Sequence, residues 1–267
     1  MQPSTRMSGV RRIARHAIIS HRIAGFGARL AALTVDALLI SVIAIHTAWS
    51  QPATDTPGYV PGNIPAMVRI DNKAYFLTGS RWANPNVPVC WESGTPEGAD
   101  RQLVVSAIES SWNAAHSHLR FIFSGTCASN AVGVRIAVRD DGDSDGPHTV
   151  GLGNQLDGKA AGMVLNFTFR TWSPACVQSE SQRQSCIRSI AVHEFGHAAG
   201  FAHEQNRPDT PGECAKQAQG GNGNVMLTPW DPHSVMNYCN PVYNNNGVLS
   251  ALDLQGLRDN RAYGVTP

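Results

Sequence analysis

The segment HEFGHAAGFAHE, residues 193–204, holds three of the ten histidines of the chain. On a helix, His193 and His197 lie four residues apart, so both imidazoles project from one face and can hold a single ion. Gly200 follows at a position where a helix can end, because glycine readily adopts the left-handed conformation that turns the chain. The turn then brings His203 back toward the first two histidines. The spacing therefore predicts a site for one divalent metal ion with three imidazole ligands.

The chemistry of these ligands indicates zinc, one ion per chain. Three neutral nitrogens leave the fourth tetrahedral position open for water, which is typical of a catalytic rather than a structural zinc site. Glu194 lies beside the ligands, where its carboxylate can reach a metal-bound water without ligating the metal. A surface helix with incidental histidines is the alternative. The full pattern H-E-x-x-H-x-x-G-x-x-H is far less expected by chance than H-E-x-x-H alone.

The full pattern is the zinc signature of the metzincin metalloproteases, and within that clan the chain resembles the astacins. The third histidine is followed directly by Glu204 in GFAHEQNRPD. Downstream, SVMNY at residues 234–238 resembles the Met-turn of the family, and LSALDLQGLRDNRAYG resembles its C-terminal helix. The resemblance covers approximately residues 81–264.

The resemblance implies catalytic roles for particular residues. The zinc ligands would be His193, His197 and His203. Glu194 would act as general base on the zinc-bound water and then pass the proton to the leaving amine. Tyr238 would be a fifth zinc ligand that swings away and then hydrogen-bonds the tetrahedral intermediate.

Three further residues are implied as structural residues near the site. Gly200 allows the turn after the helix, and Met236 lies beneath the zinc. Glu204 would contact the newly formed N-terminus of the mature protein through water.

The implied function is that of a secreted zinc-dependent endopeptidase, which hydrolyses peptide bonds of a protein or peptide substrate by a zinc-activated water. The resemblance also implies that an edge strand at Met163–Phe169 pairs with the extended substrate. A serralysin-like or matrixin-like metzincin is one alternative; serralysins share the tyrosine but usually lack the glutamate after the third histidine. A non-catalytic secreted binding module that holds zinc is another. Glu194 argues against it, because zinc used only for structure needs no such carboxylate.

The N-terminal segment has the features of an export signal. Residues 1–29 carry six arginines and no acidic residue, and the apolar run ALLISVIAI follows at Ala37–Ile45. Small residues then precede position 51, so we expect a signal peptide over residues 1–50. An uncleaved membrane anchor is the alternative, but the run is short for a span and Asp36 borders it. We expect a protein secreted to the extracellular space or periplasm, without stable membrane association after cleavage.

All six cysteines follow the predicted signal peptide, and an even number is expected for disulfides in an oxidising compartment. Six cysteines allow fifteen pairings. Local spacing favours Cys176 with Cys186 and Cys214 with Cys239, which leaves Cys90 with Cys127. A zinc–thiolate site is the alternative, but the chain has no C-x-x-C pair.

The remaining sequence divides into a linker and one catalytic domain. Residues 51–80 are rich in Pro, Gly and Thr and indicate a pro-segment or linker. The predicted domain spans residues 81–267, with an upper subdomain at 81–200 and a smaller, irregular lower subdomain at 201–267. Strands are expected at Val87–Trp91, Leu119–Phe123, Val132–Val138 and Met163–Phe169; helices are expected from Thr95 to His118, from Ser185 to Gly200 and from Ser250 to Tyr263. This order indicates an α+β fold. The resemblance implies a mixed twisted sheet, an active-site helix in the upper subdomain and a C-terminal helix in the lower one.

Charge and composition limit the other partners. The formal net charge is +1 and the arginines form no basic stripe in the predicted domain, so we expect no nucleic-acid partner. We also expect a monomer. The loop Asp141–Gly146 matches the first half of an EF-hand calcium loop. Its twelfth position is Leu152, which has no carboxylate, so calcium is weakly supported against a solvated acidic turn. His116, His118 and His148 are expected at the surface.

Overall fold

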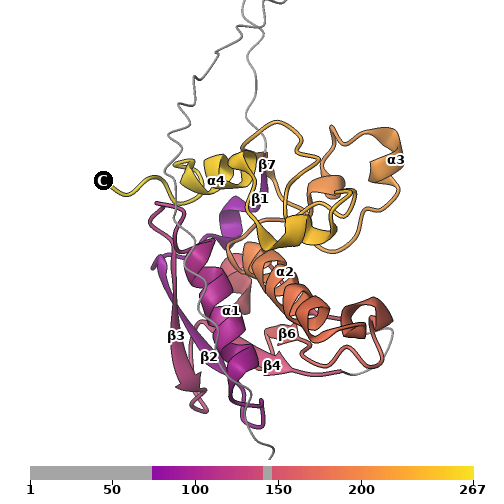
Figure 1. Cartoon of the computed structure of the whole chain (residues 1–267). Coiled ribbons are helices and arrows are strands. Elements are labelled where there is room, and N and C mark those ends of the chain that lie inside the picture. The colour runs from indigo at the N-terminus through magenta and orange to yellow at the C-terminus, as the bar shows by residue number, and fades with distance from the viewer. Residues whose placement is uncertain (1–73, 141–145) are drawn as a thin grey trace, which may run out of the picture. The chain divides into compact units, whose positions relative to one another are not determined.

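The computed structural model describes residues 74–140 and 146–267 (Figure 1). The predicted signal peptide, most of the predicted pro-segment and nearly all of the acidic loop lie outside the described residues. The strands are β1 (Tyr75–Phe76), β2 (Asn86–Trp91), β3 (Arg120–Thr126), β4 (Val134–Val138), β5 (His148–Thr149), β6 (Met163–Leu165) and β7 (Val225–Met226). The α-helices are α1 (Ala99–Ser110), α2 (Glu180–Ala198), α3 (Gly212–Ala215) and α4 (Ala251–Arg258).

Five of these strands form a mixed sheet in the order β3-β2-β4-β6-β5. The pairs β2–β3, β2–β4 and β4–β6 are parallel, and β5 is antiparallel to β6 at one edge. The predicted α+β class with a mixed sheet is confirmed for the described residues. Strands β2, β3 and β4 lie where the sequence predicted strands, because each carries several β-branched or aromatic residues, which favour strands.

Helices α1 and α2 lie side by side against the sheet (Figure 1). Trp112, just after α1, donates its indole N–H to the carbonyl of Val192 in α2 at 2.8 Å. From the same helix, Phe195 packs edge-on against Phe121 of β3, with ring centroids 4.8 Å apart. Helix α2 is therefore fixed by the apolar core along the part that precedes and carries the histidines.

The first helix is shorter than predicted. It begins after Gly98 rather than at a Thr95 cap, and it ends at Ser110 rather than near His118. The side chain of Asn113 bonds both the N–H and the carbonyl of Phe121, which turns the chain into β3. The apolar positions after Ser110 are still buried, so the helical spacing predicted their burial but not their backbone conformation.

Helix α2 begins earlier than predicted, after Ser179 instead of Ser185. The hydroxyl of Ser179 accepts the N–H of Gln182 at 3.1 Å, as a helix N-cap does. Arg183 then bonds Glu180 in the same turn and Asp100 at the start of α1. These first turns are polar, and for that reason they carried no apolar periodicity in the sequence.

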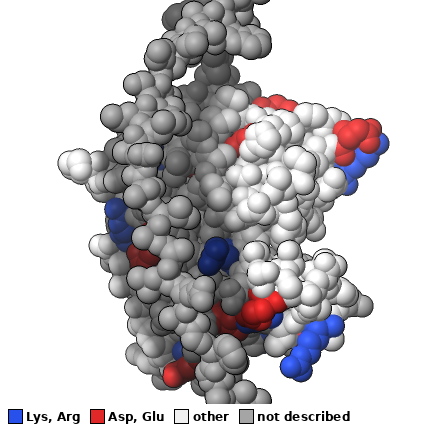
Figure 2. Space-filling model, viewed as in Figure 1, with Lys and Arg blue, Asp and Glu red and all other residues white. Residues whose placement is uncertain are grey.

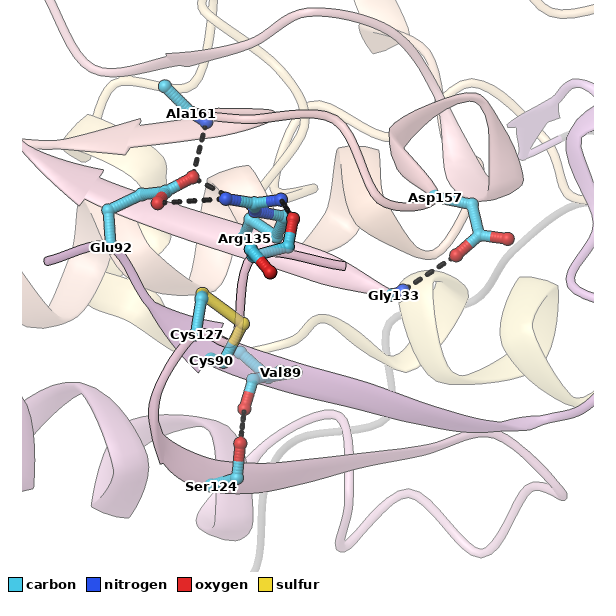
Figure 3. The surroundings of a disulfide bond; sticks show 10 residues. Val89, Cys90, Glu92, Ser124, Cys127, Gly133, Arg135, Asp157 and Ala161 are labelled. Carbon is cyan, nitrogen blue, oxygen red and sulfur yellow. Dashed lines mark hydrogen bonds and ion pairs between the residues drawn. A yellow bond between two sulfur atoms is a disulfide. The ribbon is translucent and has the colours of Figure 1, made fainter. Parts of the chain in front are cut away.

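The three predicted disulfides are all present, and no described cysteine is free. Cys90–Cys127 joins β2 to the residue after β3 (Figure 3). Beside it, Arg135 pairs with Glu92, which also accepts the N–H of Ala161 (Figure 3). The ends of three neighbouring strands are thus held together by one covalent bond and one ion pair.

The part of the chain after Gly200 has few regular elements, as predicted. Its last helix, α4, has the predicted capping box between Ser250 and Asp253 but ends at Arg258 rather than Tyr263. The fold also includes residues 74–80, which precede the predicted start at Arg81. Strand β1 pairs with β7, and Phe76 is fully buried. The division into pro-segment and subdomains stays a prediction.

The described surface carries no large patch of one charge on the face drawn in Figure 2, where acidic and basic residues form small separate groups. None of the helices in residues 74–140 and 146–267 has the length and apolarity needed to cross a membrane.

Candidate metal centre

Two of the three predicted ligands lie on the last turns of α2. His193 and His197 are buried, and their rings are nearly perpendicular with centroids 4.8 Å apart. The helix ends at Ala198, and Gly200 turns the chain with a φ of 101°. A Cβ at this glycine would lie 2.8 Å from the ring of Phe76. Both the backbone conformation and the close contact therefore require glycine.

The turn brings His203 to the other two histidines, as the spacing predicted. Its Nε2 lies 3.2 Å from Nε2 of His193 and 3.1 Å from Nε2 of His197. The three candidate ligand atoms all lie within 4.8 Å of one another. Among the described residues, these histidines are the one group of three or more His, Cys, Asp or Glu side chains that could hold a metal ion.

Backbone carbonyls fix the orientation of each imidazole. Nδ1 of His193 bonds the carbonyl of Val235 at 2.7 Å, and Nδ1 of His197 bonds that of Phe201 at 2.8 Å. Nδ1 of His203 bonds the carbonyl of Gln219 at 2.9 Å. A carbonyl only accepts, so each Nδ1 carries the proton and each Nε2 presents a lone pair.

Three lone pairs that point at one place repel one another unless a cation lies between them. Burial lowers the pKa of all three histidines, to about 3 for His193, so they are neutral near pH 7. A tetrahedral zinc ion with bonds of about 2.0–2.1 Å would hold its ligand atoms about 3.3–3.4 Å apart. The printed separations of 3.1 and 3.2 Å are close to this value. The residues therefore fit zinc, with His193, His197 and His203 as ligands.

Glu194 lines a cleft of about 1230 Å³ together with His197 and His203. Its side chain is buried, and burial raises its pKa to about 8. Its Oε2 has no hydrogen-bond partner among the described residues. A buried polar atom without a partner is costly, so its persistence here indicates a group that meets a ligand or water in the cleft.

Met236 and Tyr238 lie on the other side of the histidines. A Cβ at Gly196 would be 2.2 Å from Sδ of Met236, so the methionine packs directly against the backbone of α2. The Tyr238 ring stacks on the ring of His193 at 5.2 Å and lies 4.5 Å from that of His203. Burial, and then the charge of Glu194, raises the pKa of Tyr238, so its hydroxyl keeps its proton. The structure thus brings both residues against the helix and the three histidines, and their roles stay predictions.

Glu204 is buried and forms an ion pair that the sequence analysis missed. Its Oε1 accepts from Arg207 at 2.8 Å and from the backbone N–H of Asp231 at 2.9 Å. Its own N–H donates to the carbonyl of Met236 at 2.8 Å. Glu204, which directly follows His203, is therefore bonded to the backbone of both Asp231 and Met236. Its contact with a mature N-terminus stays a prediction, because residues 1–73 are not described.

The loop at 211–224 also contributes to the site, which its composition did not indicate. Gln219 supplies the carbonyl that orients His203, and Asn206 holds that carbonyl with its Nδ2 at 2.7 Å. Oδ1 of Asn206 accepts the N–H of Gln219 at 2.9 Å. The disulfide Cys214–Cys239 ties the same loop to the residues after the Met-turn.

The predicted substrate strand at Met163–Phe169 is wrong in one respect. Strand β6 ends at Leu165 and is paired on both sides, so it offers no open edge. The edge strand that lines the cleft is β5, a strand of two residues too short to show periodicity in the sequence. The segment His148–Leu152 lines the cleft. His148 is exposed, as expected, but it also contributes to this lining.

No protein-family model matches the chain, and no curated protein sequence matches it. Among solved structures, two entitled as myroilysin are 21% identical, with TM-scores of 0.47 and 0.42. They align over 68% and 70% of this chain and over 96% and 88% of theirs. Archaemetzincin from Methanopyrus kandleri is 9% identical, with a TM-score of 0.35, over 66% of this chain and 95% of its own. Similarities at this level do not assign a family or an activity.

Proposed function

We propose that the protein is a secreted zinc-dependent endopeptidase of the astacin-like metzincin type. The observation that carries the proposal is the convergence of three Nε2 lone pairs beside a buried carboxylate, Glu194, in the lining of an open cleft. Secretion is supported by three disulfides, which persist in oxidising compartments. The astacin-like subtype rests on His203-Glu204 and the SVMNY segment.

When bound, zinc would supply a Lewis acid that polarises the scissile carbonyl and lowers the pKa of water. Glu194 would accept the proton of the attacking water and deliver it to the leaving nitrogen, since its Oε2 has no other partner among the described residues. Burial raises its pKa to about 8, and the charge of a bound zinc ion would lower this pKa again, so the carboxylate would be ionised as a general base must be. Without this group, proton transfer in both directions would lose its carrier.

Tyr238 would stabilise the negative oxygen that develops when the carbonyl is attacked. Its ring is held against His193 and His203, and its hydroxyl stays protonated, so it can donate a hydrogen bond. A Phe substitution would leave the stacking in place and remove only the donor.

Strand β5 would bind the substrate as an added strand. Val150 donates its N–H to Gly162, so by the alternation of an antiparallel pair the N–H and C=O of Thr149 point to the open edge. An extended peptide can bond these groups without any particular side chain. The cleft would therefore accept many sequences, with preference set by its side-chain lining.

The test is zinc content and proteolysis of the same purified protein. We expect one zinc per chain, casein cleavage that a chelator abolishes, and a rate loss of at least about 10²-fold for Glu194→Ala with zinc retained. Tyr238→Phe should keep the metal and lower kcat. A protein that holds zinc but cuts no substrate in any sample is a binding module, and the proposal is then wrong.

A further inference from the structure

A short left-handed turn, Tyr243–Gly247, forms part of the cleft. Asn244, Asn245 and Asn246 have φ angles of 42°, 47° and 53°, and Gly247 has a φ of 72°. Side chains with a Cβ disfavour this region, and asparagine tolerates it better than most residues. Several such residues in succession are unusual. Strained backbone of this kind persists where the surroundings fix it, and it is concentrated at functional sites.

The surroundings do fix this turn. Gly247 lies against α2, where an added Cβ would be 3.0 Å from Cα of Ser189. Asn245 donates its backbone N–H to Val242 at 2.8 Å and its side-chain Nδ2 to Val248 at 2.7 Å. The turn is therefore anchored to the same helix that carries two of the metal ligands.

Asn244 is the one residue of this turn that is buried. It is 3% exposed and contributes to the cleft lining together with Glu194 and Tyr238. Its Oδ1 is buried and has no hydrogen-bond partner among the described residues. Tyr243, the next residue back, is half exposed at the same cleft. Burial, and then the charge of Glu194, raises the pKa of Tyr243 to about 12, and a hydrogen bond from the Asn244 side chain opposes this rise.

We propose that Oδ1 of Asn244 accepts a hydrogen bond from a backbone N–H of the bound peptide. The inference rests on the proposed function, which makes the ligand a peptide. A buried acceptor that has lost water is satisfied by a donor that enters with the ligand. Every peptide unit except one before proline offers such a donor, so this contact would add affinity without selecting a side chain.

Glycine is the informative substitution at this position. Asn244→Gly removes the carboxamide and keeps the left-handed backbone, because glycine adopts positive φ without strain. Asn246→Gly is the matched control, since Asn246 has the same residue type and backbone region but an exposed side chain. Asn244→Asp keeps the acceptor oxygen at nearly the same place.

The test is binding of a labelled eight-residue casein peptide to zinc-loaded Glu194→Ala protein that also carries each of these substitutions. We expect Asn244→Gly to weaken binding about fivefold to tenfold and Asn246→Gly to leave it unchanged. We then compare the peptide with a series of analogues in which one backbone N–H at a time is replaced by an ester oxygen. One of these analogues should bind the parent protein more weakly than the unmodified peptide does, whereas Asn244→Gly should bind the two equally. Asn244→Asp should keep the sensitivity to that analogue.

Equal affinities for the two glycine variants would overturn the inference. The inference would also be overturned if each ester analogue lost the same affinity for the parent protein and for every variant. If Asn244→Gly does not fold, Asn244→Asp takes its place, and loss of the ester sensitivity in that variant would overturn the inference. Cleavage by the wild-type protein is measured separately. If the peptide binds with the expected differences among variants but is not cut, the peptidase proposal fails and the Asn244 contact stands. If the peptide is cut but these differences are absent, the peptidase proposal stands and the Asn244 contact fails.

Discussion

The parts of the molecule before and after Gly200 are stabilised in different ways. Before it, the sheet and two helices bury an apolar core, with Phe121, Ile136 and Phe195 fully buried. After it, regular elements are few, and buried polar groups such as Glu204 and Arg207 bond one another and the backbone. Two of the three candidate metal ligands, His193 and His197, belong to the first part, and His203 belongs to the second. The geometry of the site therefore depends on both an apolar core and a polar hydrogen-bond network.

The largest effect is expected at the buried ion pair of the second part. The side chains of Arg207 and Glu204 are 0% and 4% exposed, so Arg207→Leu leaves a buried carboxylate without its cation. We expect a loss of about 3–5 kcal/mol in the free energy of unfolding, measured in urea. Arg261→Leu is the control, because its pair with Asp259 is more exposed and should be worth about 0–1 kcal/mol. Equal losses would show that the polar network does not hold this part.

The disulfides provide a second comparison. Cys214–Cys239, in the second part, closes a separation of 25 residues, and Cys176–Cys186, in the first, closes 10. Replacement of both cysteines of a pair by serine should lower the free energy of unfolding by about 3.5 kcal/mol for the longer loop and by about 2.7 kcal/mol for the shorter one. Zinc affinity, measured by chelator competition, should fall only for the longer loop, because it carries Gln219. A fall in both pairs would contradict this separation.

Asn206 tests whether the loop carbonyl orients the third ligand. Asn206→Ala removes the bonds that hold Gln219 against His203, so zinc should bind about 10- to 100-fold more weakly. Asn154→Ala removes a comparable side-chain bond, to the carbonyl of Arg81, in the first part. Its zinc affinity should be unchanged. If both variants bind zinc as the wild type does, the orienting role is refuted.

The smallest effect concerns a polar anchor in the first part. Burial alone would raise the pKa of Asp140, but hydrogen bonds from Thr168, Thr171, Asn166 and Arg170 outweigh it and hold the pKa well below its usual value. Its stabilisation is therefore present above about pH 4 and is lost as the pH falls toward the folded-state pKa. Asp140→Asn should lower the free energy of unfolding, measured in urea, by about 1–2 kcal/mol at pH 7 and by less at pH 3. Its zinc affinity should be unchanged. A deficit independent of pH would contradict the assignment to the ionised carboxyl.

The sequence predicted the parts of the site that depend on local spacing. His193, His197 and Gly200 follow from helix geometry and from the conformational freedom of glycine. The three disulfide pairs also followed from spacing along the chain. Strands β2, β3 and β4 were found through their β-branched and aromatic residues.

The sequence did not predict the features that depend on polar contacts between distant residues. The bond between Asn206 and Gln219 spans an irregular loop, and the polar first turns of α2 show no apolar period. Strand β5 has two residues, which is too few for a pattern. The asparagine run before Gly247 was the one local signal available, since Asn and Gly together indicate positive φ.

The most direct measurement is X-ray absorption at the zinc edge of the purified protein. The structure predicts one zinc per chain, bonded to three imidazole nitrogens at about 2.0–2.1 Å with light oxygen atoms completing the coordination. Glu194→Gln should leave this spectrum essentially unchanged, because the carboxylate is not a ligand. Sulfur ligands, fewer than three imidazoles, or a protein that retains no zinc would contradict the convergence of His193, His197 and His203 on one ion.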